Sequence, residues 1–304
     1  SEFGKIGKGV GGFEDCLIMR CGDDAINQIH KSVVRHQPFR EEVGSEDVSV
    51  ELVRRFEATF DRAVDPQPGD QAPLLIHQCV APAAQPMSAL GRDGHPAKGG
   101  FLPPVPLPRR MWAGGSFTFV DDIRVGDSVT RRSIIRDVVA KTGRSGPLVF
   151  VVVEHQITAS GRAVLTERQD IVFRGEANEV APKPVAETAP HGEHQRRLMP
   201  TPTLLFRYSA LTFNGHRIHY DAPYARQVEG YPGLVVHGPL LATLLCTFAA
   251  DLAGRRLRCF TFRSLCPVFD DAEIGLHANF DSAGLRLWAA RPDGPVAMEA
   301  TATF

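Results

Sequence analysis

A polar loop followed by a long apolar segment, together spanning residues 206–254, constrains the fold more than any other feature of this chain. The loop gathers amide, imidazole, guanidinium, phenol and carboxylate groups: Asn214, His216, Arg217, His219, Tyr220, Asp221 and Tyr224. The segment 238–253 is apolar nearly all round, and a helix of that kind expects protein on every side. Pro239 suits a first helical turn and Gly254 suits a helix end. The sequence therefore predicts a buried helix over 238–253, beginning beside a loop that can carry chemistry.

The rest of the chain contains strand patterns and a few further helix signals. Apolar residues recur at helical spacing over 48–60, and 73–90 is our candidate for a second buried helix, although Pro82 and Pro86 would cut it short. The segment 99–110 is too rich in proline for regular structure. Alternating or β-branched runs predict strands over 116–120, 128–143, 148–160, 163–174, 257–264, 273–280, 285–290 and 296–304.

These patterns divide the chain into two halves of similar plan. We expect residues 1–44 to be a poorly ordered extension and 176–203, rich in Ala, Pro and Glu, to be a linker. Residues 45–175 and 204–304 each read as a helix followed by an antiparallel sheet. Two such halves imply an internal duplication, and the expected class is α+β.

Composition excludes several functional classes. Hydrophobic residues make up 43% and charged residues 23% of the chain, with a net charge of -1, so no general nucleic-acid-binding surface is implied. No apolar run is long enough for a membrane span, and no secretory signal is recognisable. The six cysteines lack paired spacing, which favours reduced thiols in a cytoplasmic protein: Cys16, Cys21, Cys79, Cys246, Cys259 and Cys266.

The loop and helix start resemble the signature of the MaoC-like hydratase/dehydratase family, whose members have the hot-dog fold. The matching residues are 213–219, Phe-Asn-Gly-His-Arg-Ile-His, followed by His237-Gly238. Asn214 stands where most members carry aspartate, and Arg217 where most carry proline. The run Thr212–Asp221 and the segment 95–111 are similar to a double-hot-dog subgroup described as itaconyl-CoA or mesaconyl-C4-CoA hydratases. The likeness covers about residues 45–304 and implies two tandem hot-dog halves, each a sheet wrapped around a buried helix, that can pair edge to edge.

The resemblance assigns catalytic roles to His219, Asn214 and Gly238. A histidine can take a proton from water near neutral pH, so His219 is the expected general base. Asn214 cannot ionise, but its carbonyl oxygen can position a water. The N–H of Gly238, at a helix N-terminus, can stabilise negative charge on a thioester oxygen. Each has a plainer alternative: a packed loop histidine, an Asn-Gly turn and a glycine required by packing.

The second acid or base is left open by the sequence. His216 and Asp221 are the candidates, and Asp221 can instead orient an imidazole. His216, His219 and Asp221 also offer metal-ligand atoms, but no third histidine or cysteine pair lies at a familiar spacing, so we expect no metal site.

Several basic and aromatic residues are candidates for substrate binding. Arginine binds carboxylates in a bidentate manner, which suits the free carboxylate of a dicarboxylic substrate and the phosphates of coenzyme A. A solvated surface role is the ordinary alternative for any one arginine. The predicted substrate-binding set comprises Arg109, Arg110, His216, Arg217, Tyr220, Asp221 and His237.

The function implied by the resemblance is hydration of a branched dicarboxylic enoyl-CoA. Itaconyl-CoA to citramalyl-CoA is the leading expectation, with mesaconyl-C4-CoA next. Coenzyme A would enter only as part of the substrate, no other cofactor is expected, and a homodimer remains open. The alternatives are a 3-hydroxyacyl-thioester dehydratase of fatty chains, a hot-dog thioesterase and a non-catalytic acyl-CoA-binding module.

Overall fold

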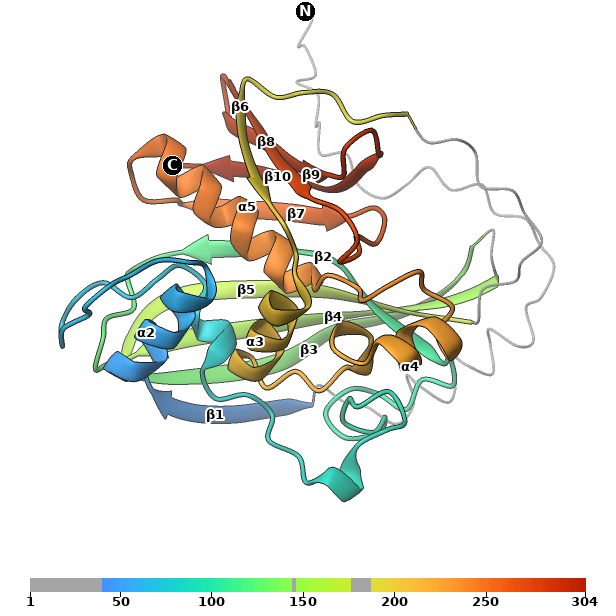
Figure 1. Cartoon of the computed structure of the whole chain (residues 1–304). Helices are drawn as coiled ribbons and strands as arrows, with labels where there is room; N and C mark the ends of the chain where they lie inside the picture. The colour runs from blue at the N-terminus through green and yellow to red at the C-terminus, as the bar shows by residue number, and fades with distance from the viewer. Residues whose placement is uncertain (1–39, 144–145, 176–186) are drawn as a thin grey trace, which may run out of the picture.

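The computed structural model describes residues 40–143, 146–175 and 187–304 as one long sheet with helices against it (Figure 1). The predicted extension 1–44 lies mostly outside these residues, as does the first part of the predicted linker. The strands are β1 (Glu41–Asp47), β2 (Arg109–Phe119), β3 (Ser128–Gly143), β4 (Gly146–Ala159), β5 (Arg162–Arg174), β6 (His194–Leu198), β7 (Cys259–Ser264), β8 (Ile274–Asp281), β9 (Gly284–Ala290) and β10 (Val296–Thr303). The α-helices are α2 (Val50–Thr59), α3 (Pro202–Leu211), α4 (Ala222–Gln227) and α5 (Gly238–Ala253). Short 3-10 turns are η1 (Ile76–Cys79), η2 (Met87–Ala89) and η3 (Arg217–His219).

The ten strands form a single antiparallel sheet in the order β1-β3-β4-β5-β2-β7-β10-β9-β8-β6. Read outward from the β2–β7 contact, the two halves repeat the same strand order, as a duplication predicts. At that contact Gly115 lies opposite Phe262. A Cβ on Gly114 would lie 2.7 Å from the Phe262 carbonyl oxygen of β7, and one on Gly115 would lie 2.1 Å from the Arg168 carbonyl oxygen of β5, so glycine permits the close approach of both neighbouring strands. Because glycine is uncommon in strands, the sequence predicted this strand only from residue 116 and missed the earlier part of β2.

The helix α5 matches the predicted bounds 238–253 and lies across one face of the sheet (Figure 1). Leu240, Leu245 and Cys246 are completely buried. Gly254 ends the helix with φ 59°, the left-handed conformation that glycine adopts without penalty. The helix contacts β7, β8, β9 and β10, so its N-terminus is held in a fixed position relative to the sheet.

The prediction of a second buried helix over 73–90 is wrong. This segment contains only the short turns η1 and η2, because Pro82 and Pro86 interrupt the backbone and Leu75 adopts φ 64°. Its apolar side chains are nevertheless in the core: Ile76 and Val80 are completely buried. The predicted amphipathic helix near 48–60 is present as α2, capped by the Ser49 side chain. Figure 1 shows α2, α3 and α5 on the same side of the sheet.

The predicted linker 176–203 is also partly wrong. Within it, β6 pairs with β8 and α3 begins at Pro202. The polar sequence of β6, HQRRL, gave no apolar alternation because β6 is an edge strand. The opposite edge strand, β1, is equally polar and extends across the boundary that we placed at residue 44. No helix in the described part of the chain is long and apolar enough to cross a membrane.

Candidate active site

The predicted loop lies between α3 and α4 and is held against a second loop from the first half of the chain. Gly94 and Gly215 are in contact, and a Cβ on Gly94 would lie 2.0 Å from the Gly215 carbonyl oxygen. The Arg217 backbone N–H donates to the Asp93 carbonyl at 2.9 Å. The site is therefore assembled from both halves, although the sequence predicted a site built mainly by the second.

His219 is the most deeply buried functional residue of the loop, with 6% of its surface exposed. Its Nδ1 donates to the Val235 carbonyl oxygen at 2.7 Å, because a carbonyl can only accept. This bond fixes the tautomer and leaves Nε2 with a free lone pair in the neutral ring. Burial lowers the pKa of His219 to about 3, against the opposing effect of the Val235 bond. His219 is thus neutral at physiological pH and can accept a proton through Nε2.

His237 and Gly238 connect the loop histidine to the start of α5. The rings of His219 and His237 stack with centroids 3.7 Å apart, and His237 Nε2 shares a 2.8 Å hydrogen bond with Ser209 Oγ. Burial, then the neighbouring His219 and His216, hold the pKa of His237 well below its usual value. A Cβ on Gly238 would lie 2.9 Å from the Trp112 ring, so a larger residue would crowd the helix start. Free N–H groups at this terminus can face a developing negative charge.

Asn214 closes the turn that presents the loop. Its Oδ1 accepts the His216 backbone N–H at 3.0 Å, and the preceding Phe213 adopts φ 51°. This contact is the Asn-Gly turn that we considered as the plainer alternative. A role in positioning water stays a prediction, since one oxygen can accept a second hydrogen bond.

Tyr220 and Asp221 stabilise the loop rather than the histidines. Tyr220 Oη donates to the Gly215 carbonyl at 2.9 Å. Asp221 accepts the Tyr224 N–H at 3.0 Å at the start of α4 and binds Arg217. These contacts lower the pKa of the Asp221 carboxyl group. The suggestion that Asp221 orients an imidazole gains no support, since its carboxylate bonds to Arg217 and the Tyr224 N–H and to no histidine among the described residues.

The three candidate arginines have different surroundings. Arg217 binds Asp221 through Nε at 3.0 Å and through a terminal nitrogen at 2.8 Å, and its guanidinium lies over the Tyr224 ring. Arg109 donates to the Glu229 carbonyl and lies 3.8 Å from its carboxylate. The Arg110 side chain makes no hydrogen bond or ion pair with any described residue. Burial lowers the pKa of Arg110, and the charge of Asp93 opposes this shift.

Arg110 lines a cavity of about 420 Å³ that His95 also lines. Three further cations line the same cavity, together with the carboxylates of Asp93 and Glu229: Arg92, Lys98 and Arg109. An unpaired guanidinium in a basic cavity favours an anionic ligand of small size. Of the three predicted arginines, only Arg110 is both partly buried and free to bind one.

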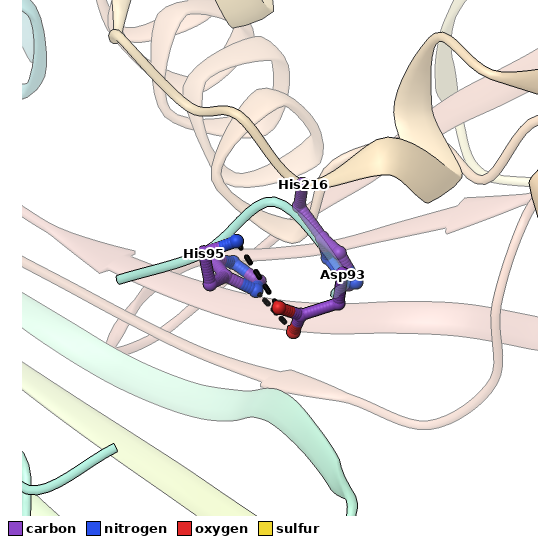
Figure 2. Close-up of side chains that lie close together, drawn as sticks. All are labelled: Asp93, His95 and His216. Carbon is purple, nitrogen blue, oxygen red and sulfur yellow. Dashed lines mark hydrogen bonds and ion pairs between the residues drawn. The ribbon is translucent and has the colours of Figure 1, made fainter. Parts of the chain in front are cut away.

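Two residues that the sequence analysis did not propose, Asp93 and His95, lie against the predicted loop and are candidates for function (Figure 2). His95 Nδ1 donates to Asp93 Oδ2 at 2.9 Å, and its ring lies 4.0 Å from that of His216, centroid to centroid. His216 in turn contacts His219 edge-on, with centroids 5.2 Å apart. The segment 95–111 had been singled out by resemblance, but nothing in the sequence placed it against His216. Among the described residues, Asp93, His95 and His216 are also the one group whose ligand-type atoms lie within 4.8 Å of one another.

Comparisons with known proteins show the family and the fold of the chain. Residues 75–270 match the family model of hydroxyacyl-thioester dehydratase type 2. A mesaconyl-C(4)-CoA hydratase from Chloroflexus aurantiacus is 47% identical over 230 residues, covering 75% of this chain and 82% of the relative. A MaoC-like dehydratase from Phytophthora capsici superposes with a TM-score of 0.66 at 13% identity, covering 90% of this chain and 97% of the other.

A second solved structure, a Mycobacterium tuberculosis protein with a double hot-dog fold, gives a TM-score of 0.55 at 16% identity and covers 87% of this chain and 94% of that one. These two structural matches confirm the fold: an α+β protein of MaoC-like, double-hot-dog type. The chain is a member of the hydroxyacyl-thioester dehydratase type 2 family.

Proposed function

We propose that this protein is a hydro-lyase that adds water reversibly to a dicarboxylic enoyl-CoA. Mesaconyl-C4-CoA is the first candidate substrate, given the 47% identity to a hydratase of that name, and itaconyl-CoA is the second. The observation that carries the choice of a dicarboxylic substrate is Arg110, a partly buried guanidinium that pairs with no side chain among the described residues and lines the same cavity as His95. A free carboxylate would pair with it in a bidentate manner.

For mesaconyl-C4-CoA, whose double bond is conjugated with the thioester, the proposed reaction uses His219 and Gly238; itaconyl-CoA would first need a proton shift that moves its double bond into conjugation. His219 Nε2 takes a proton from water as the water oxygen bonds to the β carbon of the double bond. The electron pair of the double bond moves toward the thioester, and the N–H at the start of α5 stabilises the negative charge on its oxygen. A proton then adds to the α carbon and completes the hydration. Coenzyme A enters as part of the substrate, and protein side chains supply the acid and base.

Each rival function lacks a matching feature. A dehydratase of plain fatty chains would have no use for an unpaired arginine beside the histidines. A thioesterase of this fold more often uses an acidic residue on the buried helix, and the first such residue here, Asp251, lies near the far end of α5 and binds Arg196 at 2.8 Å. A binding module would have no use for a histidine held neutral with a free nitrogen.

The test is to mix the purified protein separately with mesaconyl-C4-CoA, itaconyl-CoA and crotonyl-CoA, and to follow each by mass spectrometry. We expect a gain of one water on the dicarboxylic substrates. Arg110→Ala should lower kcat/KM for them roughly 10- to 100-fold, the value of a charged hydrogen bond, and leave crotonyl-CoA hydration unaffected. Arg286→Ala, at an exposed position on β9, is the matched control. Equal hydration of crotonyl-CoA, or release of free coenzyme A, would contradict the proposal.

A further inference from the structure

The mechanism above leaves one proton without a donor. His219 takes a proton from water, and a separate group must give one to the α carbon. Asn214 cannot do so, since an amide does not ionise, and Asp221 is bound to Arg217 and the Tyr224 N–H. His237 stacks on His219, but it is completely buried and its Nε2 is bonded to Ser209 Oγ, so it is not placed to reach a substrate. The other ionisable groups on this side of His219 are His216 and, behind it, His95 and Asp93.

The Asp93 carboxylate is positioned to stabilise the protonated form of the His95 ring. Both of its oxygens face this residue: Oδ1 accepts the His95 backbone N–H at 3.1 Å and Oδ2 accepts Nδ1–H at 2.9 Å. The second bond leaves His95 Nε2 available to carry or release a proton. Burial alone would raise the pKa of Asp93, but the hydrogen bond and charge of His95 lower it below its ordinary value. The carboxylate is therefore permanently ionised.

The charges around His95 change when a dicarboxylic substrate binds. In the free protein, burial and then Arg110 lower the pKa of His95, while Asp93 raises it. The neighbouring His216 and His219 add no charge, because burial keeps both neutral. Arg110 is the cation that lowers the pKa of His95 among the described residues, and a substrate carboxylate paired with Arg110 would offset its charge. Protonation of His95, beside the Asp93 carboxylate, would then be less opposed.

We propose that Asp93, His95 and His216 form a second proton-transfer unit that takes up a proton when the substrate carboxylate binds, and delivers it to the α carbon. This inference rests on the proposed function. His216 is the catalytic residue that contacts the substrate, and His95 and Asp93 are positioning residues behind it. A ring nitrogen of His95 lies within 4.8 Å of one of His216, so His95 passes its proton to His216, directly or through one water molecule, as His216 gives its own proton to the α carbon. The proton that His219 took from water then returns to His95, so each turnover consumes one water and no net proton.

A divalent metal ion at the same three residues is the competing interpretation. A carboxylate and two imidazoles are suitable ligands. Arg110, however, acts on both His95 and His216 as a positive charge, and it would repel a second cation. Asp93 and His95 also bind each other through two hydrogen bonds, which occupy both carboxylate oxygens and favour proton storage over metal binding.

The first experiment measures proton uptake on binding, without turnover. Methylsuccinyl-CoA, which has the free carboxylate but no double bond, is titrated calorimetrically into the protein at pH 7.5 in buffers of different ionisation enthalpy. Butyryl-CoA, which lacks the carboxylate, is the reference, so the coenzyme A phosphates cancel. We expect up to one additional proton to be taken up with methylsuccinyl-CoA. Asp93→Asn should lose at least half of this uptake, and Glu51→Gln, which alters an exposed ion pair on α2, should keep it.

The second experiment measures the kinetics of the same variants. Asparagine can still accept the His95 backbone N–H, so Asp93→Asn preserves the loop. We expect kcat to fall about 10- to 100-fold with little change in KM, and the alkaline limb of the pH–rate profile to move to lower pH, because His95 loses the carboxylate that stabilises its proton. His95→Gln should abolish that limb. Thermal melting of each variant separates these effects from misfolding.

Three results would overturn the inference. They are equal proton uptake by Asp93→Asn and the unaltered protein, an unchanged pH–rate profile in that variant, and a stoichiometric zinc or manganese ion in the purified protein that Asp93→Asn removes. Failure of the proposed function gives a different result. A protein that takes up a proton with methylsuccinyl-CoA but hydrates no dicarboxylic enoyl-CoA would contradict the hydratase and leave the proton-storage unit standing.

Discussion

At the scale of single residues, His219 combines three features that bear on its proposed role as general base. It is buried, its tautomer is fixed by the Val235 carbonyl, and burial lowers its pKa to about 3. A base with so low a pKa is weak in the free protein, but it is always in the reactive form above about pH 4. The stacked His237 ring and the edge-on His216 ring restrict rotation of the His219 ring, so the orientation of its Nε2 is fixed.

Replacing His219 should remove the chemistry while leaving binding in place. We expect His219→Ala to lower kcat for hydration about 10²- to 10⁴-fold, the usual contribution of a general base, with a small change in KM. Steady-state kinetics on the preferred dicarboxylic enoyl-CoA will measure both parameters. His194→Ala, on the edge strand β6, is the control and should behave as the unaltered protein. Undiminished hydration by His219→Ala would favour the reading of His219 as a packed loop histidine.

The sequence predicted the catalytic loop but only part of its surroundings. His219 and Gly238 were found because short motifs around them resemble a family signature. Asp93 and His95 carry no local pattern of function, and their role depends on Gly94 meeting Gly215 across 121 positions of sequence. Arg110 was predicted with two other arginines, and only the structure distinguishes the unpaired one from those bound to Asp221 and Glu229.

At the scale of elements, hydrophobic periodicity correctly predicted the strands whose successive side chains alternate between the core and the solvent. Every second residue of β4 from Val149 to Ala159 is buried, and the helix α5 is buried along most of its length. Periodicity failed at β1 and β6, whose edge positions leave both faces polar. It also failed over 73–90, where apolar residues enter the core from 3-10 turns instead of a helix. Composition alone cannot separate these two cases.

The end of α5 offers a direct test of helix termination. Gly254 has φ 59° and nothing within 4 Å of an added Cβ, so Gly254→Ala introduces backbone strain without a clash. We expect it to lower the free energy of unfolding by about 1–2 kcal/mol. Gly175→Ala is the matched control, since that position has equal space and no positive φ. Urea unfolding of the two variants will measure the difference, and equal stability would show that the helix end relaxes to another conformation.

At the scale of the whole molecule, the buried histidines make stability depend on pH. Burial lowers the pKa values of His216, His219 and His237 below that of an exposed histidine. Between about pH 6.5 and pH 3 the unfolded chain therefore binds protons that the folded chain does not. The contribution of these three histidines to the free energy of unfolding is therefore fully present above about pH 6.5 and is lost as the pH falls toward 3.

Urea unfolding should thus give a lower free energy of unfolding at pH 5.0 than at pH 7.5. His219→Gln removes one of the titrating groups and should reduce the difference between the two pH values. Equal stability at both pH values would mean that these rings gain protons in the folded protein as readily as in the unfolded chain.

The continuous sheet joined at β2 and β7 also has an evolutionary consequence. In a symmetric dimer of identical single units, every mutation appears in both copies, so neither copy can lose a part that the other needs. Fusion of the two copies into one chain removes that restriction. The second half kept the long helix and the histidine loop, whereas the first half replaced its helix with short turns and contributes the loop that carries Asp93 and His95. Such a protein gains an asymmetric site from a symmetric ancestor, and its two halves can no longer exchange roles.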